Sequence, residues 1–203
     1  QEKFIHLLPK LPNYFEVLKG DLTNFDSISS ALNEVDCVWH LAGCIYPKYR
    51  KTHYLINHIG TENIAKACIK NSVKRLIYMS TDSVCGFSRK NKRYFNFKEK
   101  YNPYKDYGKS KYLAEKLLMK YTSLNLLDVT ILRGFWFFGP NIPPRNKNFL
   151  NSFLWPIQIV FGNGKNLRSI THLDDVFNAL VKASNSSKAI GKSYWISSLT
   201  ETK

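Results

Sequence analysis

Short runs rich in apolar residues alternate with longer amphipathic stretches over the first two thirds of the chain. The runs at residues 14–18, 37–41, 75–80 and 128–133 are typical of strands in a buried sheet. Apolar residues recur at helical spacing over residues 25–35, 54–71 and 107–124, which predicts three helices between those strands. This alternation predicts an α/β fold with a parallel sheet and right-handed crossovers. Ligands of such sheets bind at the carboxyl ends of the strands.

The pattern changes after Gly139-Pro140, where prolines interrupt the chain. We expect a helix near residues 148–161, a short strand at 170–173, a helix over 174–183 and a last strand at 194–197. Residues 1–139 therefore form one predicted domain that carries the sheet. Residues 140–203 are expected to be part of a small substrate-binding region beside it.

Composition narrows the class of protein. The 203 residues are 44% hydrophobic, enough for a buried core, and carry a formal charge of +15. That charge raises the alternative of an anionic or nucleic-acid partner. Because the lysines are scattered along the whole chain, a solvated basic surface is favoured and no nucleic-acid partner is expected. No apolar run approaches the roughly 18 residues of a membrane span.

The four cysteines lack the paired spacing of a zinc site, so no metal is expected. They indicate free thiols in a reducing compartment, which favours a cytoplasmic location. The cysteines are Cys37, Cys44, Cys68 and Cys85.

Tyr107 and Lys111 are the first candidates for chemistry, because four residues on a predicted helix place both side chains on one face. A phenol has a pKa of about 10 and is a poor base at neutral pH. A neighbouring ammonium group favours the phenolate and is expected to lower that pKa. A tyrosine of this kind can exchange a proton with a substrate hydroxyl.

These motifs are part of a wider resemblance. The chain resembles the extended short-chain dehydrogenase/reductase family, in its NAD-dependent epimerase/dehydratase group, through seven segments in the family's order. They are Gly20–Thr23, His40–Gly43, Asn57–Asn63, Tyr78–Gly86, Tyr107–Lys111 with Ala114–Glu115, Leu132–Arg133 with Phe138–Pro140, and Arg168 with Asp174–Val176.

The resemblance implies a Rossmann-like, doubly wound parallel sheet that binds NAD or NADP. The glycine-rich phosphate loop that opens this fold is not found in the sequence. We therefore expect a fragment, truncated at its N-terminal βαβ unit, with residues 1–139 as a partial NAD-binding domain. Since the cofactor pyrophosphate normally rests on that missing helix, the fragment alone is expected to bind NAD weakly and to be inactive.

The resemblance also implies roles for individual residues. Thr81 would bind the substrate oxygen, Tyr107 would be the acid/base, and Lys111 would assist Tyr107 and bind the nicotinamide ribose. His40 is interpreted as a packing residue. The implied cofactor-binding residues are Asp21, Leu22, Ala42, Gly43, Asn57, Ser80, Tyr107 and Lys111. The implied substrate-binding residues are Asp82, Ser83 and Arg168.

Three functions stay open at this point. The first is a nucleotide-sugar epimerase or related enzyme that acts by transient hydride transfer. The full-length protein of this kind could form a homodimer. The second is a dehydrogenase or reductase of an apolar hydroxyl or ketone, similar to 3β-hydroxysteroid dehydrogenases. It gains support because Gly134–Phe137 lacks the asparagine of many sugar epimerases. The third is a non-catalytic dinucleotide-binding protein.

Overall fold

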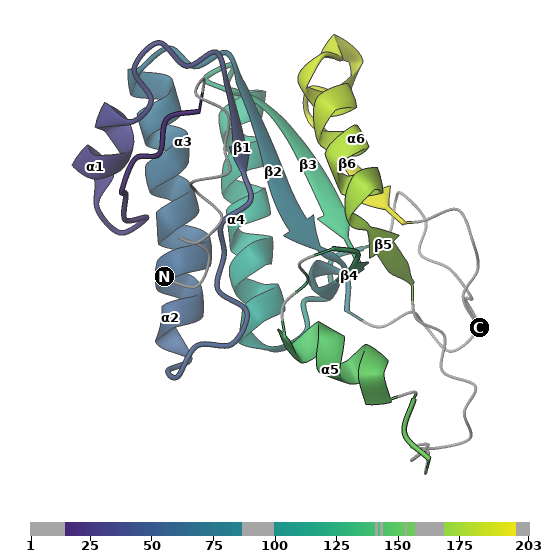
Figure 1. The fold of residues 1–203 in the computed structure, drawn as a ribbon. Coiled ribbons are helices and arrows are strands. Elements are labelled where there is room, and N and C mark those ends of the chain that lie inside the picture. The colour runs from purple at the N-terminus through teal and green to yellow at the C-terminus, as the bar shows by residue number, and fades with distance from the viewer. Residues whose placement is uncertain are drawn as a thin grey trace.

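A computed structural model describes residues 15–86, 100–140, 142, 144–152, 154–156 and 169–197. Its main sheet has four parallel strands in the order β1-β2-β3-β6 (Figure 1). The predicted parallel arrangement is therefore confirmed. The strands are β1 (Cys37–His40), β2 (Arg75–Thr81), β3 (Asp128–Gly134) and β6 (Lys192–Ile196).

Helices cover both faces of this sheet, as the doubly wound prediction requires (Figure 1). On one face lie α1 (Phe25–Ser30), α2 (Lys51–Tyr54), α3 (Gly60–Lys70) and α4 (Lys105–Ser123). A π-helical turn, η2 (Leu55–Ile59), joins α2 to α3. On the other face lies α6 (Leu173–Ser184).

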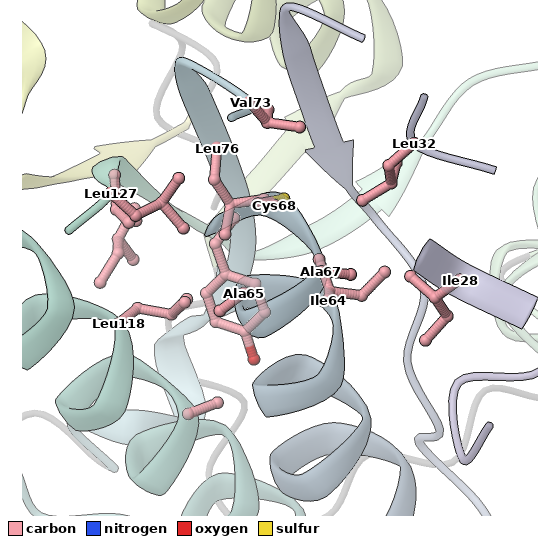
Figure 2. Packing of buried hydrophobic residues seen from close by; sticks show 14 residues of the cluster. Ile28, Leu32, Ile64, Ala65, Ala67, Cys68, Val73, Leu76, Leu118 and Leu127 are labelled. Carbon is pink, nitrogen blue, oxygen red and sulfur yellow. The ribbon is translucent and has the colours of Figure 1, made fainter. Parts of the chain in front are cut away.

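The central strand β2 is buried along its whole length and links two hydrophobic clusters. Leu76 and Tyr78 point toward α3 and α4, where they pack with side chains such as Leu118 (Figure 2). Ile77 and Met79 point toward α6. Alternation along a strand thus places one cluster on each face of the sheet.

Two predicted elements in the N-terminal part need correction. The strand predicted at 14–18 is wrong for residues 15–18, which form no regular structure; Tyr14 lies outside the described residues. Phe15, Val17 and Leu18 are each more than half exposed, at 54%, 56% and 55%. A strand needs a hydrogen-bonded neighbour, and none lies beside these residues within the part of the chain that the structure describes. The helix predicted at 25–35 ends at Ser30.

Beyond residue 139, the chain returns to the main sheet. A small second sheet pairs β4 (Trp136–Phe138) with β5 (Ile170–His172) in parallel. Residues 148–152 of the helix expected at 148–161 belong to α5 (Pro144–Ser152), which begins earlier because proline suits the first turn of a helix. Residues 153 and 157–161 of that prediction lie outside the described residues. After α6, the short helix η4 (Ser187–Ala189) leads into β6. The division at residue 139 stays a prediction, with α6 and β6 contributing to the same layers as residues 25–134.

The described ranges lack two kinds of feature. None of the helices there is long and apolar enough to cross a membrane. The described residues contain no group of three or more histidine, cysteine or acidic side chains that would hold a metal ion. All four cysteines are free thiols; Cys68 and Cys85 are buried, whereas Cys37 and Cys44 are only partly buried.

Candidate active site

A polar cluster follows directly after the carboxyl end of β2. Thr81 caps the short helix η3 (Asp82–Val84), because its hydroxyl oxygen accepts a hydrogen bond from the Ser83 backbone N–H at 3.3 Å. The same hydroxyl donates to Asp82 Oδ1 at 2.9 Å, and the Ser83 hydroxyl lies 3.4 Å from that oxygen. Three of the predicted site residues therefore share one turn of chain.

The start of α4 is pressed against this turn. The Tyr104 backbone N–H donates to the Ser83 carbonyl at 2.9 Å. A Cβ atom at Gly108 would lie only 2.4 Å from the same carbonyl oxygen, so the approach requires glycine. It brings Tyr107 next to Thr81, whose hydroxyl lies close enough to the Tyr107 side chain to affect its pKa. Side chains separated by 26 positions in the sequence thus meet at one point.

We expect Gly108→Ala to lower the free energy of unfolding by roughly 1–3 kcal/mol, the usual cost of overpacking. The reason is that the new methyl group would overlap the Ser83 carbonyl. Urea unfolding followed by circular dichroism measures the change. Gly20→Ala is the matched control, because nothing lies within 4 Å of a Cβ at that position. Equal losses in the two variants would contradict the close contact between α4 and η3.

The pKa of Tyr107 differs from the expected direction. Burial raises it to about 12, the Thr81 hydrogen bond lowers it by less, and the charges on Asp82 and Tyr46 raise it further. The expectation that Lys111 lowers this pKa is therefore wrong for the chain by itself. At neutral pH the phenol keeps its proton and can donate it.

Lys111 is buried beneath the site at 4% exposure. Its ammonium group donates to the Met79 carbonyl at 2.6 Å and lies 4.3 Å from the centre of the Tyr78 ring. Burial lowers the pKa of Lys111 to about 7, although the Glu115 carboxylate partly opposes this. The lysine is thus only partly charged at neutral pH, which limits its effect on Tyr107.

This pKa predicts a dependence of stability on pH. Between pH 7 and the ordinary lysine pKa of 10.5, the unfolded chain binds a proton at Lys111 that the folded chain does not. The free energy of unfolding should therefore rise with pH in that window, by up to about 1.4 kcal/mol per pH unit from this group. Lys111→Met should lose this contribution, so the difference between the two unfolding curves should grow from pH 7 to 10. Parallel curves would show that Lys111 does not titrate in this range.

Asn57 joins the loop after β1 to α4. Its amide accepts a hydrogen bond from the Cys44 backbone N–H at 2.7 Å and donates to the Cys44 carbonyl at 2.9 Å and to the Ser110 hydroxyl at 3.0 Å. Asn57 lies in the π-helical turn η2, and such turns occur frequently at functional sites. The side chain therefore holds three elements of the site together.

A chain of hydrogen bonds fixes the backbone of the same turn. The Thr61 hydroxyl donates to the Asn57 carbonyl at 2.7 Å, so it can only accept from His40 Nε2 at 2.9 Å. Burial, assisted by the charge on Lys111, lowers the pKa of His40 to about 3, which keeps the ring neutral. This position agrees with the interpretation of His40 as a packing residue.

The other predicted cofactor residues lie near this edge of the sheet. Ala42 and Gly43 are exposed after β1, and a Cβ at Gly43 would lie 3.3 Å from Asn57 Oδ1 and 3.8 Å from Lys111 Nζ. Ser80 is buried, and its hydroxyl has no hydrogen-bond partner among the described residues.

Asp21 and Leu22 are placed beside α3. Asp21 Oδ1 accepts hydrogen bonds from the Thr23 backbone and hydroxyl, both at 2.8 Å. Leu22 packs so closely on Gly60 that a Cβ there would lie 2.9 Å from the leucine Cβ. Arg168, predicted to bind substrate, lies outside the described residues.

Sequence reasoning missed a buried ion pair behind the site. Arg133 donates two hydrogen bonds to Glu115, at 2.6 and 3.0 Å, and both side chains are almost completely buried. The Tyr101 hydroxyl donates to the same carboxylate at 2.7 Å. The available signal was Arg133, a charged residue in a strand predicted to be buried, because a buried charge needs a partner.

Comparison with known proteins identifies the family. A family model described as "NAD dependent epimerase/dehydratase family" matches residues 3–197. The chain belongs to the NAD-dependent epimerase/dehydratase family. The predicted resemblance to the extended short-chain dehydrogenase/reductases is thereby confirmed.

Two curated relatives illustrate the range of the family. An uncharacterized protein, y4nL of Sinorhizobium fredii, is 31% identical over 188 residues, which cover 91% of this chain and 53% of the relative. Short-chain dehydrogenase/reductase family 42E member 1 of Danio rerio is 26% identical over 210 residues, or 92% of this chain and 54% of the relative. The chain thus spans about half the length of these relatives.

Solved structures confirm the fold. The UDP-glucuronic acid 4-epimerase of Bacillus cereus, in complex with UDP-glucuronic acid and NAD, superposes with a TM-score of 0.85 at 24% identity. The match covers 98% of the chain described here and 66% of the Bacillus cereus epimerase. At this identity, the likeness shows a shared Rossmann-like architecture.

Proposed function

We propose that this chain carries the catalytic residues of an NAD(P)-dependent enzyme that acts on a nucleotide-sugar by transient hydride transfer. The observation that carries the proposal is the meeting of Thr81 and Tyr107 at the end of β2, with Lys111 one helical turn beyond. The relatives whose structures were solved with NAD and a UDP-sugar support this substrate class. The chain spans about half the length of its curated relatives, so the activity stays a proposal for the whole protein.

The residues at the strand ends fit a nicotinamide cofactor. The exposed backbone at Ala42–Gly43 allows close approach, and the buried Ser80 hydroxyl lacks a partner that a bound group would supply. Lys111, within reach of Gly43, would bind the ribose hydroxyls, and Asp21 with Leu22 would hold the adenine end. When bound, NAD or NADP supplies the hydride acceptor and donor.

The proton steps belong to the protein. Tyr107 would exchange a proton with the substrate oxygen, and the neighbouring Thr81 hydroxyl would hydrogen-bond the same oxygen. The raised pKa of Tyr107 favours donation to a substrate carbonyl. Taking a proton from a substrate hydroxyl requires nearby positive charge, which an oxidised nicotinamide would provide next to the partly charged Lys111. Asp82 and Ser83, which share hydrogen bonds with Thr81, are proposed to contact the substrate.

A second candidate is a dehydrogenase or reductase of an apolar hydroxyl or ketone. It is supported by the aromatic residues after β3, where Phe135 stacks on Trp195 at 5.5 Å and Trp136 packs on Phe149 at 4.7 Å. The 26% identity to 3beta-hydroxysteroid-dehydrogenase/decarboxylase isoform 2 of Arabidopsis thaliana also favours it. The third candidate is a non-catalytic dinucleotide-binding protein, which would have the same fold but would not turn over a substrate.

One experiment separates these functions. The natural protein is incubated with UDP-glucose and UDP-glucuronic acid, and separately with a hydroxysteroid and NAD, while NADH absorbance and product NMR are followed. A new sugar epimer without net NADH supports the proposed function, because the hydride returns to the same substrate. Net NADH formed from the steroid would assign the second candidate. Nucleotide released from the natural protein on denaturation would also favour the epimerase, which keeps its cofactor bound between turnovers. A corrupted glycine-rich loop in the natural protein would favour the third function.

A further inference from the structure

Two basic segments lie side by side next to the candidate active site. Residues 45–51 lead into α2, and residues 100–105 lead into α4. Arg50 bridges them by pairing with Asp106, with Nε 2.6 Å from one carboxylate oxygen and Nη2 3.1 Å from the other. Figure 1 draws the lower ends of α2 and α4 next to each other, at the carboxyl edge of the sheet. The segments therefore form one continuous surface.

This surface has a strong positive charge. Lys48, Lys51, Lys100 and Lys105 are all exposed. Asp106 is the only acidic residue in 45–51 and 100–109, and Arg50 and the Tyr54 hydroxyl already occupy its carboxylate. Four lysines consequently face solvent without an acidic neighbour from these two segments.

Apolar and aromatic side chains are exposed among the lysines. Ile45 and Tyr46 are 49% and 67% exposed, and Tyr49 and Tyr104 are 57% and 42% exposed. We call this surface the basic rim and define it by Lys48, Lys51, Lys100 and Lys105 with Ile45, Tyr46, Tyr49 and Tyr104. Tyrosine rings between lysines suit the boundary between lipid headgroups and acyl chains.

We propose that the basic rim docks on the anionic surface of a phospholipid bilayer. Lysines near such a surface are attracted by its negative potential, while the isoleucine and tyrosines can enter the headgroup layer. The rim residue Lys51 begins α2, and the same helix carries His53, whose ring centre lies 6.0 Å from that of Tyr107. Docking would therefore place the mouth of the candidate active site beside the membrane.

A single-stranded nucleic acid is the competing partner, since it also uses cations and aromatic rings. Base stacking needs free ring faces. On the rim, the Lys48 ammonium lies 5.3 Å from the centre of the Tyr49 ring, and the Lys105 ammonium lies 5.1 Å from the centre of the Tyr104 ring. Lysines that occupy these rings favour a lipid surface over stacked bases.

The test measures partition of the natural protein onto vesicles by flotation. Vesicles of phosphatidylcholine alone are compared with vesicles that contain phosphatidylserine at about a third of the lipid. We expect binding only to the anionic vesicles, with most of it lost at 1 M salt, where charges are screened within about 3 Å. Each lysine contributes roughly a fivefold factor to partition. Changing the four rim lysines to glutamine should therefore lower partition by about a hundredfold or more.

A matched control removes the same number of charges elsewhere. The variant with Lys120, Lys182, Lys188 and Lys192 changed to glutamine alters exposed lysines outside the rim and should keep most of its binding. Equal losses in the two variants would overturn the proposal, because general charge would then explain the binding. So would equal binding to both kinds of vesicle, or no binding to either. A labelled single-stranded RNA that binds more tightly than the anionic vesicles, and loses binding only in the rim variant, would assign the rim to nucleic acid and also overturn it.

Discussion

Replacing Tyr107 with phenylalanine should lower turnover of the natural protein by about 10²–10⁴-fold, the usual contribution of a general acid–base group. The substitution removes the hydroxyl next to Thr81 and keeps the ring, whose centre lies 6.0 Å from the centre of the His53 ring. Binding of substrate should change little, because the lost interaction acts mainly on the transition state. Steady-state kinetics measures both quantities, with the substrate that the experiment under the proposed function identifies.

Tyr121→Phe is the matched control for this prediction. It makes the same chemical change near the other end of α4, where Tyr121 packs against the hydrophobic core. It should leave turnover within about twofold. Thr81→Val should reproduce part of the Tyr107 effect, since it removes the second hydroxyl and keeps the shape. Near-normal turnover in the Tyr107→Phe variant would contradict the proposed role of Tyr107 in proton transfer.

Breaking the buried pair behind the site should cost about 3–5 kcal/mol of unfolding free energy, the largest effect on stability that we expect. Glu115→Leu leaves the Arg133 guanidinium, which is 4% exposed, without its carboxylate. Arg133→Met leaves the buried carboxylate of Glu115 with only the Tyr101 hydroxyl. Each single variant therefore holds an uncompensated charge in the interior.

The double variant distinguishes this cause from simple loss of packing. With both charges removed, most of the desolvation penalty disappears, so Glu115→Leu with Arg133→Met should be more stable than either single variant. Guanidinium unfolding of all four proteins gives the coupling. Additive losses in the double variant would mean that the two side chains act independently.

The sequence allowed the two central strands to be predicted because they are buried on both faces. All seven residues of β2 and six of the seven residues of β3 are buried, and the two strands pair in parallel along their whole length. The candidate site followed as well, since Thr81 and Tyr107 come directly after a strand and at the start of a helix. Residues 15–18 show the limit of this reasoning, because a short apolar run cannot reveal whether a neighbouring strand exists.

The remaining differences depend on distant contacts. The pKa of Tyr107 depends mainly on how deeply its ring is buried. The four-residue spacing to Lys111 gives no information about that burial. The pairing of Glu115 with Arg133 joins α4 to β3 across 18 positions. Each of these requires the packed structure, since no local pattern encodes it.

The π-helical turn at Leu55–Ile59 has a consequence for how this region is compared between relatives. In that turn the Gly60 N–H donates to the Leu55 carbonyl five residues earlier, so the turn holds one residue more than an α-helical turn. An extra residue rotates every later side chain by about 100°, the angle between successive residues of an α-helix. The side chains of residues 51–57 and those of residues 60–70 therefore point in directions that a single uninterrupted α-helix would not give them. Deleting a single residue here would swing Asn57 away from Cys44 and Ser110, or turn the apolar stripe of α3 off the sheet. The length of this segment is thus as tightly constrained as its composition.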